Sequence, residues 1–196
     1  AEVMLRECLA RGIDNAVLVS DRAFAGADTL ATSNTLAAAA GKIEDFSLII
    51  CGKQATDGDT AQVGPGIAEK LDIPHVAYVK KIEDMNRNII VLERMMEDGY
   101  DVIESPLPAL ITVVKEINMP RLPSLRGTLA AKKAQITKWT QADLGIDSSL
   151  IGLKGSPTWV KKIFTPPQRK GGEKLSPKPE EAGAELARKL KDLKVI

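Results

Sequence analysis

The segment Cys51–Pro65 (CGKQATDGDTAQVGP) combines glycines and short oxygen-bearing side chains directly before an expected helix. Gly52 and Gly58 relax the backbone there. Free N–H groups at the start of a helix favour the binding of phosphate. We therefore predict that this segment is a nucleotide loop, in which the backbone N–H groups of Thr60–Val63 hold the phosphates.

Two carboxylates in this loop, those of Asp57 and Asp59, complicate a phosphate site because they repel anions. We expect them to cap the following helix or to accept hydrogen bonds from ribose hydroxyls. The alternative is an ordinary connection between a strand and a helix, in which Gly and Asp only make a turn. Two glycines alone are a weak signal.

A second loop, Asp21–Thr32 (DRAFAGADTLAT), has the same place between a strand and a helix. Phe24 can cover a flat ring, and Thr29 or Thr32 can bind phosphate; the alternative is that Asp28 or Thr29 caps the helix. We expect both loops at one edge of the sheet, where they form one crevice. The candidate cofactor-binding residues are Asp21, Phe24, Ala25, Ala27, Thr29, Thr32, Cys51, Gly52, Asp57, Gly58, Asp59, Thr60, Ala61, Gln62, Val63, Gly64 and Pro65.

The elements that position these loops alternate along the first half of the chain. Ala16–Ser20 (AVLVS) and Phe46–Ile50 (FSLII) are apolar runs that predict strands, and the second has the pattern of a strand buried on both faces. Helices are expected over Thr29–Ala40 and between Val63 and Pro74. This order predicts right-handed crossovers in an α/β fold with a doubly wound, mostly parallel, Rossmann-like sheet.

The second half of the chain is expected to be less regular. Turn residues and prolines separate three further strands, which are His75–Ile82, Asn86–Met95 and Ala109–Val114. Residues 146–179 contain five prolines and no apolar periodicity, which predicts an extended arm, and an amphipathic helix follows from Glu180. We therefore expect an α/β domain over 1–145 and an arm with a C-terminal helix over 146–196.

Composition argues against several classes of function. A formal net charge of +1 and 4% aromatic residues argue against a nucleic-acid groove or a stacking platform. Residues 161–196 carry ten Lys and Arg against five Asp and Glu, which suits an acidic partner. Cys8 and Cys51 have no neighbouring Cys or His, so no metal site is predicted, and the single His75 is expected to be structural rather than catalytic.

Features of targeting are absent from this sequence. It has no signal peptide and no apolar run of about eighteen residues, so we expect a cytoplasmic location without a membrane span. The chain begins without Met and already in a helical pattern that Gly12 ends, so we expect a fragment of a longer chain.

The basic segment Arg121–Lys133 (RLPSLRGTLAAKK) contains a small apolar knob, formed by Leu122 and Leu125 next to Arg126. An apolar knob among polar residues suits a pocket on a protein partner. The alternative is a solvated basic loop. The candidate partner-binding residues are therefore Leu122, Leu125 and Arg126.

With these motifs in view, the chain resembles the β subunit of electron-transfer flavoproteins. CGKQATDGDTAQVGP resembles the nucleotide loop of that family, LPALITV is similar to its later strand, and NMPRLPSLRGTLAAKK resembles its partner-recognition loop and following helix. The order of the three motifs is more specific than any one of them. The resemblance implies an adenine-nucleotide α-hydrolase-like fold, and a chain that lacks the N-terminal region of the family with its first strand and first phosphate loop.

The nucleotide loop also separates two branches of that family. In the housekeeping branch the β subunit holds a structural AMP, and the loop usually reads Asp-Asp-Asp and Asn-Gln-Thr-Gly. Here Asp57–Asp59 (DGD) and Ala61–Pro65 (AQVGP), together with DRAFAGADT, resemble the electron-bifurcating branch, whose β subunit holds FAD. Gly58 and Gly64 are expected to remove side chains where the longer dinucleotide runs close to the backbone. The motif also resembles subunits from nitrogen-fixing organisms.

The resemblance implies an electron-transfer subunit in which the cofactor, and no catalytic side chain, does the redox chemistry. In the bifurcating branch a hydride from NADH reaches this FAD. One electron then passes to the FAD of the α subunit and on to an acyl-CoA dehydrogenase, and the other passes to ferredoxin or flavodoxin. The arm and final helix would embrace the α subunit, and Leu125 corresponds to the anchor that inserts into the dehydrogenase. The alternatives are a housekeeping subunit with AMP and a stand-alone adenine-nucleotide sensor or hydrolase.

Overall fold

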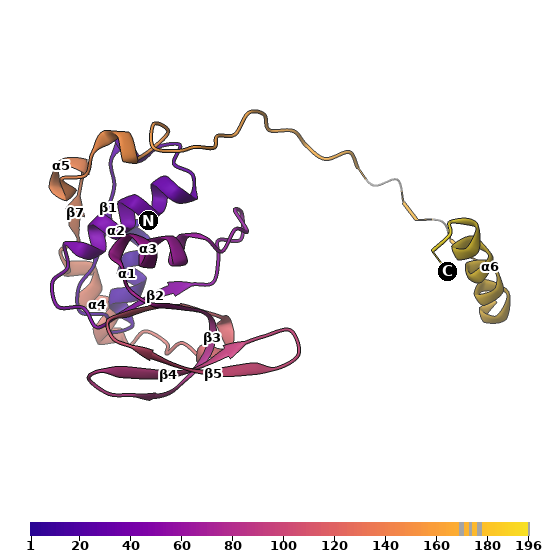
Figure 1. The fold of residues 1–196 in the computed structure, drawn as a ribbon, viewed down its shortest axis with the longest axis horizontal. Helices are drawn as coiled ribbons and strands as arrows, with labels where there is room; N and C mark the ends of the chain where they lie inside the picture. Colours follow the sequence, from indigo (N-terminus) through magenta and orange to yellow (C-terminus); the bar gives the residue numbers. More distant parts are fainter. Residues whose placement is uncertain (169–170, 173, 176–177, 196) are drawn as a thin grey trace. The chain divides into compact units, whose positions relative to one another are not determined.

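The computed structural model describes residues 1–196 except 169–170, 173, 176–177 and 196 (Figure 1). The chain divides into two compact units, Ala1–Trp159 and Val160–Ile196. Residues 146–159, which the sequence assigns to the arm, pack within the first unit. The second unit contains an extended segment and the helix α6 (Pro179–Asp192).

The first unit is built around a five-stranded sheet in the order β2-β6-β3-β4-β5. Its strands are β2 (Leu48–Gly52), β3 (His75–Met85), β4 (Ile89–Met95), β5 (Tyr100–Pro106) and β6 (Ala109–Val113). β2, β6 and β3 are parallel, whereas β3, β4 and β5 form an antiparallel meander. A separate parallel pair joins β1 (Val17–Val19) to β7 (Thr137–Trp139). The predicted α/β fold with a mostly parallel, Rossmann-like sheet is confirmed.

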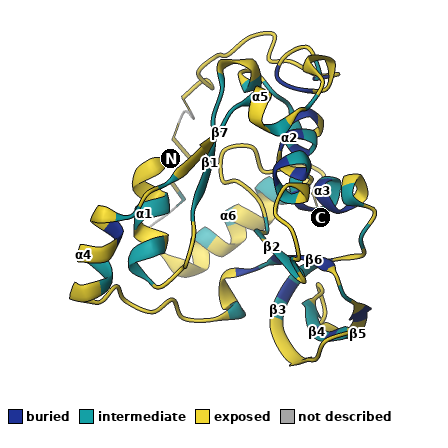
Figure 2. Cartoon of the chain, turned by 90° about the vertical axis from the view of Figure 1, so that its left-hand side faces the viewer, coloured by how far each residue is buried: buried dark blue, intermediate teal, exposed yellow. Residues whose placement is uncertain are grey.

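Two helices that follow β1 and β2 cover one side of the parallel strands. The helices of the first unit are α1 (Glu2–Ala10), α2 (Thr29–Gly41), α3 (Val63–Leu71), α4 (Leu125–Lys133) and α5 (Gln141–Leu144). Ala37 of α2 and Ile67 and Ala68 of α3 pack with Leu110 of β6 in one buried cluster. Figure 2 shows the buried residues of α2 and α3 in dark blue. This packing fixes the start of α3 against the sheet.

The second buried cluster lies on the sheet itself. It consists of Val76 and Val79 of β3, Ile90 and Leu92 of β4, and Ile111 of β6. Four of these five side chains are fully buried, with 0% of their surface exposed. The alternation that predicts strand β3 therefore places its valines in the core.

The strand before the nucleotide loop differs from the prediction. β2 runs over Leu48–Gly52 rather than Phe46–Ile50, and it lies at the edge of the sheet, where β6 is its one partner among the described strands. Ile50 is 59% exposed, so the prediction of burial on both faces is wrong. An apolar run does not distinguish an edge strand from a central strand, because the number of neighbours is set by the topology.

Two strands are absent from the sequence prediction. β5 (YDVIESP) contains acidic residues and a proline, which are poor strand formers, and it forms because a turn pairs it with β4. Its turn is closed by a hydrogen bond from the Met96 N–H to the Gly99 carbonyl, 3.0 Å. β7 has only three residues. Within the described residues, no helix is both long and apolar enough to cross a membrane.

Candidate functional site

The parallel part of the sheet ends at one edge, where β2 and β6 stop beside Val79 of β3. The N–H of Lys53, just after β2, donates to the Val113 carbonyl of β6 at 3.0 Å, and the Val114 N–H donates to the Val79 carbonyl of β3 at 3.1 Å. β2 and β6 therefore end side by side, next to Val79 of β3, and β3 continues beyond this point to Met85. In open α/β sheets this edge is where ligands bind.

A cleft of about 440 Å³ opens at this edge, between the end of β2 and the start of α3. Its volume lies in the range of small-molecule sites. We call it the loop cleft. Seven predicted cofactor-binding residues line it, namely Cys51, Gly52, Thr60, Ala61, Gln62, Val63 and Gly64. Leu36, Lys53, Gln54, Ala55 and Ile67 complete its wall.

The loop between β2 and α3 is held by its own hydrogen bonds. The Asp59 N–H donates to the Ala55 carbonyl at 2.9 Å, and the Gln54 side-chain amide donates to the Asp59 carboxylate. Asp59 and Ala61 adopt left-handed backbone angles, with φ of 49° and 54°. Such angles are unfavourable for residues other than glycine and occur often at functional sites. The loop is therefore a specific structure rather than a loose turn.

The predicted capping of α3 by Asp57 or Asp59 is wrong. α3 begins at Val63, so its N-cap residue is Gln62, which makes no side-chain cap hydrogen bond. The Asp57 carboxylate instead accepts from the Gly58 N–H at 2.9 Å. Because the first N–H groups of a helix have no partner within it, the uncapped start of α3 can donate hydrogen bonds to an anion in the loop cleft.

Packing against the sheet requires glycine at position 64, which the sequence alone does not reveal. A Cβ atom placed on Gly64 would lie 2.5 Å from Cγ2 of Thr112 on β6, whereas a Cβ on Gly58 would meet nothing within 4 Å. Gly64 thus allows α3 to approach the sheet, and the predicted explanation, space for a dinucleotide at Gly64, is replaced by helix packing. At Gly58 the space beside the backbone is open.

The second predicted loop reaches the loop cleft through one residue. The Thr29 hydroxyl donates to Oε1 of Gln62 at 2.9 Å, which joins the start of α2 to the start of α3. The two loops therefore meet as expected. The predicted residues outside the lining of the loop cleft are Asp21, Phe24, Ala25, Ala27, Thr29, Thr32, Asp57, Gly58, Asp59 and Pro65.

Other contacts account for the position of the Asp21–Asp28 segment. The Asp21 carboxylate accepts from the N–H groups of Ala23 and Gln141, both at 3.0 Å, and these bonds lower the pKa of Asp21. The Ala25 carbonyl accepts from the Leu153 N–H at 3.1 Å. This segment therefore holds the residues that follow β7, and the next residue, Thr29, contacts the wall of the loop cleft through Gln62.

Among the residues at the carboxyl edge that sequence reasoning missed, Lys53 and Tyr78 contact each other. Lys53 lies inside the predicted loop and lines the loop cleft, and its ammonium group is 5.1 Å from the ring centre of Tyr78 on β3. Tyr78 has a left-handed φ of 60°. A lysine beside glycines was a weak signal for Lys53, but no sequence pattern marks Tyr78, because its position depends on a bulge in β3.

The predicted partner knob is exposed at the start of α4. Leu122 is 88% exposed and Leu125 is 79% exposed, and Arg126 is also exposed. The Ser124 hydroxyl accepts from the Gly127 N–H at 3.0 Å and so caps the helix directly before Leu125. The helix begins at Leu125 and so places this residue in its first turn. Leu125 and Arg126 therefore lie in a capped helix, whereas Leu122 precedes it.

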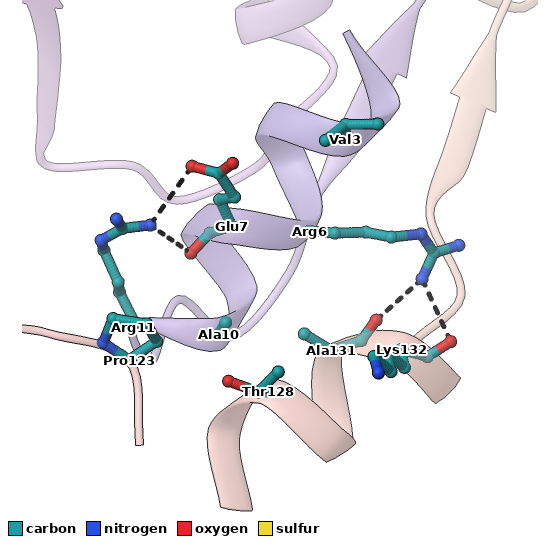
Figure 3. Close-up of a pocket in the computed structure, with 9 residues that line it drawn as sticks. All are labelled: Val3, Arg6, Glu7, Ala10, Arg11, Pro123, Thr128, Ala131 and Lys132. Atoms are coloured by element: carbon teal, nitrogen blue, oxygen red, sulfur yellow. Dashed lines mark hydrogen bonds and ion pairs between the residues drawn. The ribbon is translucent and has the colours of Figure 1, made fainter. Parts of the chain in front are cut away.

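The packing of α1 against α4 supports this knob. In Figure 3 the Arg6 side chain reaches from α1 to α4, where it donates to the carbonyls of Ala131 at 2.7 Å and Lys132 at 3.4 Å. Arg6 thus satisfies carbonyl groups at the end of α4. A pocket of about 500 Å³ lies between the two helices, lined by Val3, Arg6, Glu7, Ala10, Arg11, Pro123, Thr128, Ala131 and Lys132.

Comparisons with known proteins agree with this arrangement. The sequence model of the family described as "Electron transfer flavoprotein domain" matches residues 1–144. "Electron transfer flavoprotein subunit beta" of Thermoanaerobacterium thermosaccharolyticum is 49% identical over 197 aligned positions, covering 100% of this chain and 75% of the relative. The chain belongs to the electron transfer flavoprotein β subunit family. The predicted family is confirmed.

Further relatives of this β subunit carry more specific names. "Caffeyl-CoA reductase-Etf complex subunit CarD" of Acetobacterium woodii is 49% identical over 197 aligned positions, with 100% of this chain and 75% of the relative covered. "Protein FixA" of Azotobacter vinelandii is 49% identical over 175 residues, covering 86% of this chain and 62% of the relative. Membership of the family implies an α subunit as partner and a flavin or nucleotide as cofactor.

The two cysteines of this β subunit give a chemical probe of the loop cleft. Burial raises the pKa of the Cys51 thiol, whereas Cys8 is exposed. Because the thiolate is the reactive form, iodoacetamide should alkylate Cys8 faster than Cys51. Cys51 lines the loop cleft, so a nucleotide bound there should slow its alkylation further and leave Cys8 unchanged. Peptide mass spectrometry measures alkylation at both cysteines. Protection of both cysteines, or of neither, by added nucleotide would contradict binding in the loop cleft.

Asp28 forms a junction between α2 and the residues before the arm. Its Oδ1 accepts from the N–H groups of Leu30 and Ala31, both at 3.0 Å, and Oδ2 accepts from the N–H and hydroxyl of Thr158 at 3.1 and 2.9 Å. Burial acts to raise the pKa of Asp28, but these hydrogen bonds to the charged form outweigh it and the net pKa is lowered. The expected capping of α2 by Asp28 is confirmed.

This junction makes stability depend on pH in the acid range. A carboxylate with a lowered pKa stabilises the fold above its ordinary pKa of about 3.9 and loses that contribution as pH falls through the lower, folded-state pKa. We expect the unfolding temperature of the wild type to fall more steeply than that of Asp28→Asn below about pH 5. Circular dichroism melts measure this, and Asp14→Asn at an exposed site should keep the wild-type slope. Equal slopes of unfolding temperature against pH for Asp28→Asn and the wild type would show that the junction does not contribute to the pH dependence of stability.

Proposed function

We propose that this β subunit binds FAD with its phosphates in the loop cleft and that this FAD divides the electrons of NADH between two acceptors. One electron passes to the FAD of the α subunit and on to an acyl-CoA dehydrogenase, and the other passes to ferredoxin or flavodoxin. A flavin accepts the two electrons of a hydride together and releases them singly, which is the chemistry that this division needs.

The observation that carries the proposal is the uncapped start of α3 beside the loop cleft. The N–H groups of Gln62, Val63 and Gly64 lie at this helix start, where the helix dipole also favours an anion. The Thr60 hydroxyl lines the same cleft and can donate to phosphate. These groups suit a phosphate-bearing nucleotide, and the residues of the loop position it without catalytic side chains.

Gly58 supports FAD rather than AMP. Nothing lies within 4 Å of a Cβ placed there, so packing of this chain does not demand glycine at that position. A ligand that runs along the exposed backbone would explain why glycine occupies this position. The name of the Acetobacterium woodii relative, a subunit of a reductase complex, is consistent with a redox role. The alternative is a housekeeping subunit in which AMP fills the loop cleft and the chain only docks the dehydrogenase.

Substitution of Gly58 in the heterodimer with the α subunit tests the proposal. Gly58→Asp creates the Asp-Asp-Asp sequence of the housekeeping branch. The space around this position is open, so the fold should be unchanged. The added carboxylate should repel the pyrophosphate of FAD. We expect the Kd of FAD at this subunit to rise by at least about tenfold, as an unfavourable 1.4 kcal/mol would produce. Gly58→Ala should cause a smaller rise. Unchanged FAD binding by Gly58→Asp would contradict the proposal that the dinucleotide runs along this loop.

A further inference from the structure

Tyr78 has an unfavourable backbone conformation in the middle of a strand. Its φ is 60°, a left-handed angle that is rare for large side chains. The pairing of β3 with β6 shifts its register between Val76 and Val79, so Tyr78 lies in a bulge. Bulges often redirect a side chain next to a ligand site, and strained residues concentrate at such sites.

A buried hydroxyl holds Tyr78 in this conformation. The Tyr78 N–H donates to Oγ1 of Thr112 at 3.1 Å, and Thr112 is 2% exposed. The methyl group of Thr112 lies against Gly64 at the start of α3. Thr112 therefore contacts both the bulge and the nucleotide loop, and it fixes their relative position.

The bulge places the ring of Tyr78 in a second cleft of about 550 Å³. We call it the Tyr78 cleft. It is lined by Lys53, Ala77, Tyr78, Arg94, Met95, Met96 and Glu97. Lys53 lines this cleft and the loop cleft alike, with its ammonium group 5.1 Å from the Tyr78 ring centre. The two clefts therefore adjoin at Lys53, at the carboxyl edge of the sheet.

The lining of the Tyr78 cleft suits a planar ring with negative charge nearby. An aromatic face and methionine sulfur both pack well against flat rings. Lys53 and Arg94 contribute two cations; the Arg94 guanidinium is 3.7 Å from the Asp101 carboxylate, and no such carboxylate contact is found for Lys53 among the described ion pairs. Lys53 is thus available to a phosphate that passes from one cleft to the other.

We propose that the Tyr78 cleft binds the second ring system of a dinucleotide whose first phosphate lies in the loop cleft. This inference rests on the proposed function. With FAD, the isoalloxazine ring would lie against Tyr78 and the second phosphate beside Lys53. AMP has neither of these groups and leaves the Tyr78 cleft empty. Tyr78 and Lys53 therefore select a dinucleotide over a mononucleotide.

Variants of Tyr78 in the heterodimer test this selection. Leucine in Tyr78→Leu must adopt the same left-handed backbone angle but lacks the aromatic face. Phenylalanine in Tyr78→Phe retains that face. After removal of bound cofactor, titration with FAD and with AMP gives both affinities. We expect Tyr78→Leu to bind FAD about tenfold more weakly, in line with the loss of one ring stacking contact, with AMP affinity unchanged. Tyr78→Phe should bind both like the wild type.

Lys53 provides an independent arm of the same experiment. Lys53→Met should weaken FAD binding by about tenfold, as loss of one charged hydrogen bond predicts, with less effect on AMP, and Lys53→Arg should restore it. Equal losses of FAD and AMP affinity in Tyr78→Leu would show a structural role and overturn the inference, as would unchanged FAD affinity. If the wild-type loop cleft accepts AMP but not FAD, the proposed function fails instead.

Discussion

Gly64→Ala is expected to lower the free energy of unfolding by about 1–3 kcal/mol, the usual cost of forcing extra volume into a packed core. The added Cβ would lie 2.5 Å from Cγ2 of Thr112. Thr112 cannot rotate away freely, because its hydroxyl accepts from the Tyr78 N–H and its side chain is buried. The start of α3 must therefore move away from β6, which should also weaken nucleotide binding.

Thr112→Ser separates this clash from other causes. Serine lacks the Cγ2 methyl group but keeps the hydroxyl that Tyr78 needs. In urea unfolding, the double variant should be more stable than the sum of the two single effects predicts, with a coupling energy of about 1 kcal/mol or more. Gly58→Ala, with open space around its Cβ, should change stability by less than about 0.5 kcal/mol. Additive effects of the two substitutions would show that Gly64 is constrained by something other than Thr112.

We propose that Leu125 anchors an acyl-CoA dehydrogenase, so Leu125→Ala is expected to weaken docking of that partner by about 2 kcal/mol, or about thirtyfold in Kd, the size typical of a central apolar anchor. Leu125 is 79% exposed, so its truncation leaves no cavity in the free subunit. The cap by Ser124 and the support of α4 by Arg6 remain in place. Folding stability and flavin content should therefore stay at wild-type values.

Surface plasmon resonance with the purified heterodimer and dehydrogenase measures this effect. Leu153→Ala is a matched control, since Leu153 is 61% exposed outside α4. It should bind the dehydrogenase like the wild type. An unchanged Kd for Leu125→Ala would exclude the knob as an anchor. Loss of FAD in Leu125→Ala would show that the segment belongs to the fold of the cofactor site.

The sequence predicted the elements whose signals are local. α2 has a continuous small and apolar pattern between its Asp28 cap and Gly41, and α3 ends before Pro74, so both were expected where the structure has them. β5 was missed because its side chains give no strand pattern, and its conformation follows from pairing with β4. The edge position of β2 was missed for a related reason, because exposure of Ile50 depends on which strands are neighbours.

The candidate site likewise has features that local sequence predicts and features that depend on contacts between distant segments. The nucleotide loop was predicted from its composition, but the reason for Gly64 lies in Thr112, a residue far along the sequence. Tyr78 enters the site through a bulge, which its own sequence neighbourhood does not reveal. Contacts between distant segments therefore decide the details of the site, and local patterns indicate only its general place.

The cofactor content of the native heterodimer tests the central claim most directly. Acid extraction followed by chromatography separates FAD from AMP, and both can be counted per mole of heterodimer. We expect two FAD, one held by the α subunit and one by this chain, and no AMP. One FAD and one AMP per heterodimer would contradict electron division at this subunit and assign the loop cleft to a structural nucleotide.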